Sequence, residues 1–310
     1  MTDQPRQQHT LSRFYIARFG DAAEKPSKNP NVWYYPLDES HPRTWRRERA
    51  KQVSVRRDYY TEHRIPDEGK YGLEKALKLS EDWAAEPIAK VCDGRNPTPE
   101  DIHAVALFMT TTMARAPAYV GALGALRTDT TRKAMRSLYG RVKKDPEEHA
   151  RVVSQLQTRG LDPVDLRDPE TFNPDRVRFV PSPASAAQTL IEAGTDLTLR
   201  LVGMVWLVFR TTKDEPFITS DVPLCPSADG PTVDLTFPLS SRIALYLRDH
   251  PAATNGGRQT VFEDRAATAE FVSLVNHRTA RRAQEFLLSS RQHFPGHDQI
   301  LEQLKRGAAI

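Results

Sequence analysis

The spacing of apolar residues predicts that the middle of this chain is mostly helical. Leu73–Val91 carries apolar side chains at the spacing of an amphipathic helix. Thr98-Pro99-Glu100-Asp101 has the residue types of a helix start, with Thr98 as the N-cap. This second helix should continue until Pro117 bends or ends it. Further helices are expected over residues 118–142, 146–158 and 184–201.

The segments that flank these helices are shorter. Leu11–Phe19 places its apolar side chains on one side of a short helix, which His9-Thr10 would open. Short strands are expected at Val32–Tyr35 and Gln52–Arg56. Residues 161–183 contain five prolines among Asp and Asn residues, which predicts a loop, either a lid or a linker.

From Met204 the pattern changes to that of strands. Four strands are expected, over residues 205–210, 216–220, 233–237 and 242–247, and a polar turn joins the first two. A turn at Asn255-Gly256-Gly257 follows. Apolar spacing then predicts a closing helix from Asp264 to Ser289 and a basic tail after it.

These elements predict an α+β fold, in which a central helical region precedes a small antiparallel sheet and a C-terminal helix packs on that sheet. We expect a single domain over residues 1–300 and a tail over 291–310. Its parts are an N-terminal helix with short strands (1–70), a mainly helical region (71–203) with the proline-rich loop (161–183), antiparallel strands (204–262) and the last helix (263–290).

Composition agrees with a globular protein, because 39% of the 310 residues are hydrophobic and 27% are charged. A chain of this length buries a sizeable core without a metal or a disulfide. Cys92 and Cys225 lie far apart and lack CxxC or Cys/His spacing, which excludes a zinc finger. The N-terminus has no apolar core region, and Leu197–Phe209 is too short to span a bilayer. We therefore expect a cytoplasmic protein without a membrane partner.

The net charge is +4, and the basic residues concentrate between Arg43 and Arg57, where Glu48 is the only acid. Aromatic residues flank this segment, which we call the basic strip. Such a strip can follow a phosphate backbone, and the alternative is a solvated face or strand edge. Its candidate binding residues are Arg46, Arg47, Arg56, Arg57 and Tyr59.

Asn276 lies in the apolar row of the predicted last helix, one turn from Val272 and one from Ala280. An unpaired buried amide costs about 1–3 kcal/mol, so Asn276 requires a specific partner. Either it ties down a neighbouring loop, or it orients a catalytic group or a ligand.

Ser220-Asp221 follows an apolar strand and precedes Val222-Pro223. Polar residues at the end of a strand are well placed for a site, where Asp221 would act as a base or bind a divalent metal. The alternative is an ordinary turn that Ser220 caps.

Arg115 and His9 are the remaining candidates. Arg115 follows Ala104 and Phe108 on one row of its helix, so its guanidinium should point partly inward and pair with a carboxylate or a phosphate. Asp221 and an anionic ligand are both candidate partners. Histidine is the natural proton carrier near neutral pH, although a lone histidine near an N-terminus is usually incidental.

Common cofactor and catalytic motifs are absent from the sequence. It contains no GxGxxG, GxxxxGK[ST], HExxH or GxSxG, so nothing in it requires ATP, NAD or zinc. The cofactor and the oligomeric state stay open.

Several landmarks of the chain, taken in order, resemble the uncharacterised, mainly microbial domain-of-unknown-function family 4238. The segment His9–Phe19 is similar to the family's H-x-x-P-x-x-Y-L-x-x-F opening, although Leu11-Ser12 stands where the family tends to carry proline. Later landmarks are Val32–Tyr35, Arg57-Asp58-Tyr59-Tyr60, Arg115-Ala116-Pro117, Phe217–Pro223, Phe237-Pro238-Leu239-Ser240 and Val275-Asn276 with Ala280.

This resemblance implies that His9, Arg115, Ser220, Asp221 and Asn276 belong to one shared framework. Our hypothesis is a hydrolytic or group-transfer enzyme acting on a nucleotide or nucleic acid. In it Asp221 is the base or metal ligand, Arg115 holds negative charge and His9 moves a proton, while Ser220 and Asn276 position them. The rival hypothesis is a non-catalytic protein that binds nucleic acid, or another protein, through the basic strip.

Overall fold

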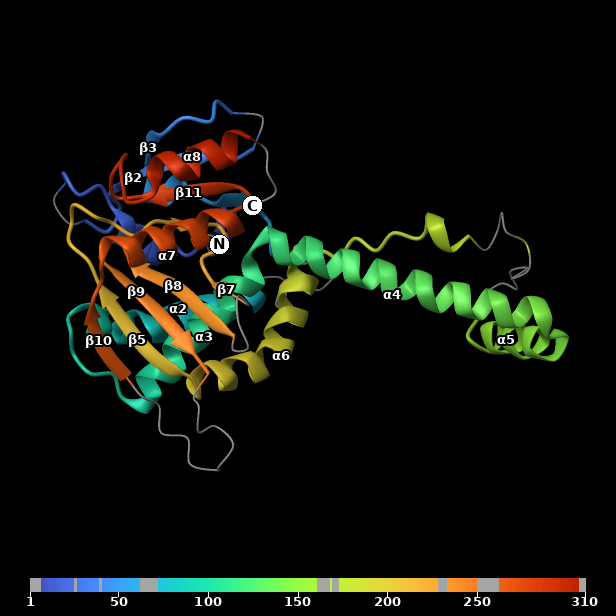
Figure 1. The fold of residues 1–310 in the computed structure, drawn as a ribbon. Coiled ribbons are helices and arrows are strands. Elements are labelled where there is room, and N and C mark those ends of the chain that lie inside the picture. Colours follow the sequence, from blue (N-terminus) through green and yellow to red (C-terminus); the bar gives the residue numbers. More distant parts are fainter. Residues whose placement is uncertain are drawn as a thin grey trace, which may run out of the picture. The chain divides into compact units, whose positions relative to one another are not determined.

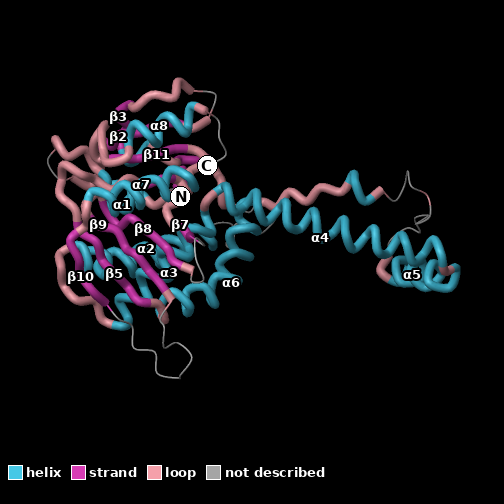
Figure 2. The backbone as a smooth tube through the Cα atoms, viewed as in Figure 1, coloured by secondary structure: helices cyan, strands magenta, loops and turns pink. Residues whose placement is uncertain are grey.

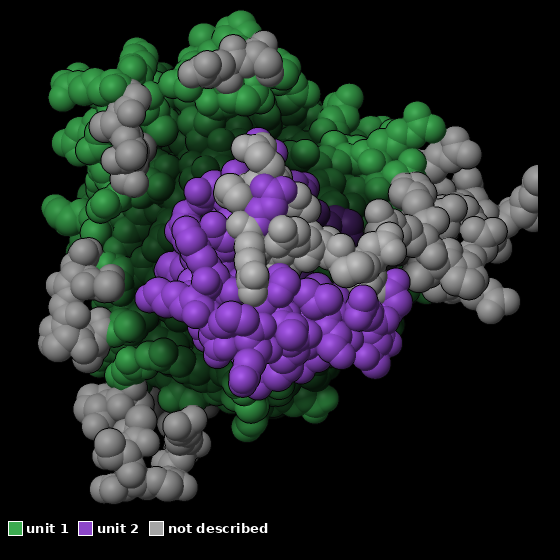
Figure 3. All heavy atoms as spheres, turned by 90° about the vertical axis from the view of Figure 1, so that its right-hand side faces the viewer, with its two compact units in different colours: residues 1–118, 183–310 green, residues 119–182 purple. Residues whose placement is uncertain are grey.

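The computed structural model describes residues 7–24, 27–38, 41–61, 72–160, 168, 173–227, 233–249 and 262–306. Eight α-helices and eleven strands lie in this described part and form the expected α+β fold. The chain divides into two compact units, residues 1–118 with 183–310 and residues 119–182, which Figure 3 colours separately. A compact unit need not fold independently, so the single domain over residues 1–300 stays a prediction.

A five-stranded sheet forms the centre of the larger unit (Figure 1). Its strands, in spatial order, are β10 (Phe262–Ala266), β5 (Val205–Arg210), β9 (Ile243–Arg248), β8 (Asp234–Ser240) and β7 (Cys225–Ser227). β10 is parallel to β5 and the other neighbours are antiparallel, so the sheet is mixed rather than purely antiparallel.

A four-stranded sheet lies in the same unit. Its order is β3 (Arg46–Arg49), β2 (Asn31–Pro36), β11 (Phe286–Ser289) and β6 (Thr219–Ser220), all antiparallel. A separate two-stranded ladder joins β1 (Gln7–His9) to β4 (Val55–Arg57). His9 therefore belongs to a strand, and the first helix, α1 (Arg13–Ile16), begins only after Ser12.

The central helices match their predicted ranges closely. They are α2 (Gly72–Cys92), α3 (Pro99–Arg115), α4 (Pro117–Lys144), α5 (Pro146–Thr158) and α6 (Pro183–Val202). α3 begins as its sequence predicts, because the Thr98 hydroxyl accepts from the Asp101 amide at 3.2 Å and the Asp101 carboxylate accepts from the Thr98 amide at 2.8 Å.

The main core lies between the five-stranded sheet and the helices α2 and α3 (Figure 2). Trp206 and Leu245 from the sheet are buried there with Phe108 and Ile88 from the helices. α7 (Ala269–Arg282) packs its Val272 side on the opposite face of the same sheet. The sheet is therefore covered on both faces, which explains why its central strands β5 and β9 are mostly apolar.

The predicted closing helix exists but is too long, since only Ala269–Arg282 of the range Asp264–Ser289 is helical. The segment forms β10, then α7, then β11, because Ala283 leaves helical geometry at ψ 136° and every residue of β11 is buried between β2 and β6. Leu287 continues the helical spacing of α7 by coincidence, since β11 is buried throughout and three of its four residues are apolar.

Three further expectations need correction. The segments 205–210 and 216–220 do not pair as a hairpin, because β5 joins the five-stranded sheet and β6 the four-stranded one. Residues 291–310 are not merely a tail: they include α8 (His297–Lys305), whose Ile300 packs with Leu287 and Tyr35. The predicted strand at Gln52–Arg56 is shifted, since a 3-10 helix covers Ala50–Gln52 and β4 follows it.

The smaller unit contains most of α4, together with α5 and the segment from residue 173 to 182. The hydroxyl of Thr128 accepts from the Phe179 amide at 2.8 Å, and Arg132 donates to the Val177 carbonyl at 3.0 Å, so this segment is attached along α4. Residues 161–167 and 169–172 of the predicted loop 161–183 lie outside the described residues. The predicted turn at residues 255–257 lies outside them as well.

Candidate functional site

Arg115 on α3 and Glu81 on α2 form the ion pair of the candidate site, and the charges of both act on the pKa of His9 on β1. Arg115, at the end of α3, is 4% exposed and forms an ion pair with Glu81. Its partner is thus Glu81, where the sequence suggested Asp221 or an anionic ligand. Nε of Arg115 is buried and has no hydrogen-bond partner in the described part of the chain.

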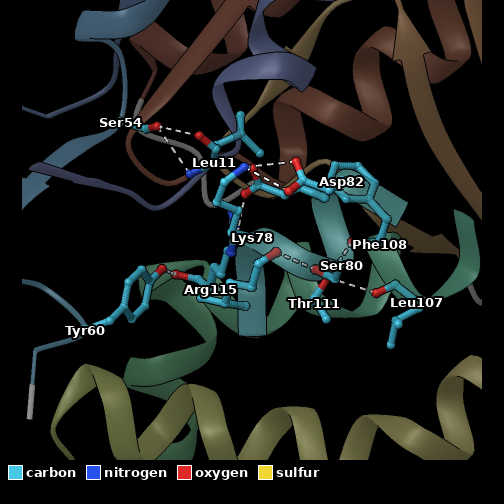
Figure 4. Close-up of polar contacts among 12 residues, drawn as sticks. Leu11, Ser54, Tyr60, Lys78, Ser80, Asp82, Leu107, Phe108, Thr111 and Arg115 are labelled. Atoms are coloured by element: carbon cyan, nitrogen blue, oxygen red, sulfur yellow. Dashed lines mark hydrogen bonds and ion pairs between the residues drawn. The ribbon is translucent and has the colours of Figure 1, made fainter. Parts of the chain in front are cut away.

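Neighbouring side chains hold this pair in place (Figure 4). The Tyr60 hydroxyl donates to the backbone carbonyl of Arg115 at 3.2 Å. The hydroxyls of Ser80 and Thr111 lie 3.4 Å apart, so a polar contact joins α2 to α3 one turn from the ion pair. The base of the site is therefore built from two packed helices, which fix side chains more precisely than a loop does.

His9 lies on β1, and the charges of this ion pair are among the causes of its pKa shift. Its Nε2 lies 3.3 Å from the carbonyl oxygen of Lys51. A carbonyl only accepts, so Nε2 carries the proton and Nδ1 of the neutral ring carries the lone pair. Burial lowers the pKa of His9 below its usual 6.5, and the positive charges of Arg13 and Arg115 act in the same direction. His9 is consequently a neutral base near pH 7.

Glu74 adds an acid to the site. Burial raises the pKa of its carboxyl above the usual 4.5; the charge of Arg115 opposes that change, and the charge of Glu81 adds to it. His9 and Glu74 are both half-buried, and the charges of Arg115 and Glu81 act on the pKa of each. Such opposed shifts are typical of sites of acid–base chemistry.

The sequence analysis missed Glu74 and Glu81, although the sequence contains a signal for them. Both stand at apolar-stripe positions of α2, in register with the buried residues Leu77, Ala84 and Ile88. A carboxylate in such a stripe requires a partner or a function, in the same way as an amide.

Asp221 lies in a different place and is 2% exposed. Its Oδ1 accepts from the backbone amides of Gln284, Glu285 and Phe286 at 3.0, 3.1 and 3.4 Å. Its Oδ2 is buried without a hydrogen-bond partner among the described residues. Burial raises the pKa of Asp221 to about 6 against the opposing effect of these amides. Asp221 thus anchors the connection from α7 to β11.

Ser220 and Asn276 also bond to the backbone. The Ser220 hydroxyl accepts from the Val222 amide at 3.1 Å, which is the turn interaction that the sequence left open. Asn276, on α7, accepts from the Ile218 amide at 2.9 Å and donates to the carbonyls of Pro216 and Pro295 at 3.2 and 3.1 Å. These contacts tie two loops to α7, and they correspond to the structural alternative for Asn276.

Most arginines of the basic strip pair with acids. Arg46 pairs with Glu48 at 2.9 Å, Arg47 with Asp21 at 2.8 Å and Arg57 with Asp58 at 3.6 Å. A further pair joins Arg56 to Glu285, and the Arg56 guanidinium lies 5.1 Å from the centre of the Tyr59 ring. Local pairing of this kind reduces the positive potential available to a phosphate backbone.

Among the described residues, no group of three or more His, Cys, Asp or Glu side chains is placed to hold a metal ion. Oδ1 of Asp221 bonds to backbone amides only. Within the same part of the chain, no helix is both long and apolar enough to cross a membrane.

The structure defines an α+β protein in which the Glu81–Arg115 ion pair joins α2 to α3 and its charges act on His9 and Glu74. The chain belongs to the family described as protein of unknown function (DUF4238), whose model matches residues 7–293. This confirms the resemblance found in the sequence. Comparison with curated proteins finds no match, and comparison with solved structures finds none either.

Proposed function

We propose that this protein is a hydrolytic or group-transfer enzyme whose reaction takes place at His9, Glu81, Arg115 and Glu74. The observation that carries the proposal is that one ion pair, Arg115 with Glu81, acts electrostatically on two half-buried groups from separate elements, His9 and Glu74, whose pKa values shift in opposite directions. A purely structural role would involve only the ion pair between Glu81 and Arg115. It would not require opposite pKa shifts on His9 and Glu74.

In this proposal Nδ1 of His9 accepts a proton from the attacking group, because Nε2 is directed to the Lys51 carbonyl. Glu74 supplies a proton to the leaving group. Arg115, which Glu81 orients, stabilises the negative charge that develops beside the base. Asp221, Ser220 and Asn276 act as positioning residues for the framework, since their polar contacts are made to backbone groups.

We propose a phosphate-containing substrate, such as a nucleotide, because an arginine beside a base suits an anionic reacting group. The rival function, nucleic-acid or protein binding through the basic strip, has less support because of the ion pairs within the strip. A cytoplasmic location agrees with either function and remains part of the proposal.

The test is a screen of the wild-type protein against chromogenic phosphate monoesters, phosphate diesters and nucleotides. Removal of a general base should lower kcat/KM by about 100-fold or more, and His9→Gln should show this loss with an unchanged urea midpoint. The matched control is His293→Gln, since His293 is exposed and far along the chain. Activity of wild type should rise with pH along a limb whose apparent pKa lies below 6.5, the usual value for histidine. Equal rates for His9→Gln and wild type would exclude this function for His9.

A further inference from the structure

A pocket of about 500 Å³ opens in the larger unit, where the C-terminal end of α2 lies against the turn between β8 and β9. Arginines from three segments line it: Arg18 from the 3-10 helix Ala17–Phe19, Arg210 from the end of β5 and Arg242 from the turn. Glu81 and Cys92 are 11 positions apart on α2, so this pocket lies about 16 Å from Glu81 along the helix.

Arg210 lines the pocket, and four hydrogen bonds hold its guanidinium group in place. Its Nε donates to the two carboxylate oxygens of Asp264 at 2.8 and 2.6 Å. Its terminal nitrogens donate to the carbonyls of Cys92 at 2.8 Å and Val91 at 2.6 Å, which caps the C-terminal end of α2. The charge of Arg210 is thus compensated within the protein.

Arg18 and Arg242 are not compensated in this way. Nη1 of Arg18 contacts the Cys92 sulfur at 3.4 Å, and Nε of Arg18 is buried with no hydrogen-bond partner among the described residues. Arg242 is exposed and forms no ion pair in the part of the chain that the structure describes. The pocket's acid, Asp93, pairs with Arg95 at 3.3 Å. Two guanidinium charges therefore face one pocket whose acid, Asp93, pairs with Arg95 and with neither of them.

The backbone holds these two charges together. The Ser241 amide donates to the carbonyl of Arg18 at 3.2 Å, and the Arg242 amide donates to the Ser240 hydroxyl at 3.2 Å. The segment that carries Arg242 is therefore attached to the segment that carries Arg18. Like charges held together repel, and an anion that accepts from both guanidinium groups relieves the repulsion.

We propose that this pocket is a second ligand site, which binds the phosphate group of a small phosphorylated molecule through Arg18 and Arg242. Planar guanidinium groups match the oxygens of a phosphate, and the hydroxyl of Ser241 adds a further donor at the pocket. The volume exceeds what a phosphate fills and leaves room for the organic part of the ligand. The inference goes beyond the proposed function and does not depend on it.

Calorimetric titration with inorganic phosphate and with pyrophosphate at low ionic strength tests the site. Arg242→Ala should weaken pyrophosphate binding by about 10-fold or more, because it removes an exposed charge that contacts the ligand. Arg248→Ala is the matched control, since Arg248 is an equally exposed arginine at the other end of β9. It should change the affinity by less than about 2-fold.

Cys92 provides a second readout. The chain has two cysteines and Cys225 is 1% exposed, so a thiol reagent labels Cys92 in the pocket. Pyrophosphate should slow this labelling in wild type and in Arg248→Ala, but not in Arg242→Ala. His9→Gln should bind pyrophosphate as wild type does, which separates this proposal from the enzymatic one. Absence of protection at saturating pyrophosphate, equal weakening by both arginine variants, or tighter binding of citrate than of pyrophosphate would each overturn the proposal.

Discussion

The free energy of unfolding of Asp221→Asn, relative to that of wild type, should increase as the pH rises. The side chain keeps its Oδ1, which accepts from the three amides of residues 284–286, but it can no longer ionise. In wild type the pKa rises from 3.8 in the unfolded chain to about 6 in the fold, because burial disfavours the charged form. The fold therefore binds this proton more tightly than the unfolded chain does.

The sign and size of the effect follow from this difference. The stability that the protonated carboxyl contributes is fully present below pH 3.8 and is lost as the pH rises through about 6. The complete loss is about 3 kcal/mol, since each pH unit between the two pKa values contributes about 1.4 kcal/mol. Of this, about 2 kcal/mol falls between pH 4.5 and 7.5, a range suited to measurement.

Urea denaturation of both proteins at several pH values in that range provides the assay. The free energy of unfolding of Asp221→Asn minus that of wild type should increase by about 2 kcal/mol from pH 4.5 to 7.5. The matched control is Asp82→Asn, because Asp82 is 61% exposed and pairs with Lys78 at the surface. Its difference should stay within about 0.5 kcal/mol. A difference for Asp221→Asn that is constant, or that falls with pH, would show that the three amide bonds outweigh desolvation, and would refute the reasoning.

Three further outcomes are expected. Arg115→Ala should lower the free energy of unfolding by about 3 kcal/mol, measured in urea, because it leaves Glu81 unpaired. The loss of stability in the double variant with Glu81→Gln should be smaller than the sum of the losses in the two single variants. Asn276→Ala should cost at least about 2 kcal/mol, since three backbone groups lose their partner, and a loss below about 0.5 kcal/mol would contradict this role. Arg47→Ala should leave the salt dependence of any oligonucleotide binding unchanged, because Arg47 already pairs with Asp21; a reduced slope of affinity against salt would restore the basic strip as a binding surface.

The candidate site could be predicted only in part. A polar residue in an apolar row identified Arg115 and Asn276, and the same criterion applied to α2 would have identified Glu74 and Glu81. The criterion finds buried polar groups but not their partners. The inward position expected for Arg115 agrees with its exposure of 4%, but its partner is Glu81; Asp221, expected as a candidate partner, is 2% exposed and bonds to a different part of the chain.

What the sequence determined by itself is the set of helices from Gly72 to Val202, with their ends. Their stripes repeat at the helical period, and local groups such as the Thr98–Asp101 capping box specify where a helix begins, so neighbours within four residues suffice. The strands at the C-terminal end were decided by the tertiary structure. Phe286–Ser289 is a strand because β2 and β6 provide its hydrogen bonds, and these lie about 250 and 67 positions away in the sequence. The Glu81–Arg115 ion pair has the same origin, since only the packing of α2 against α3 brings these two side chains together.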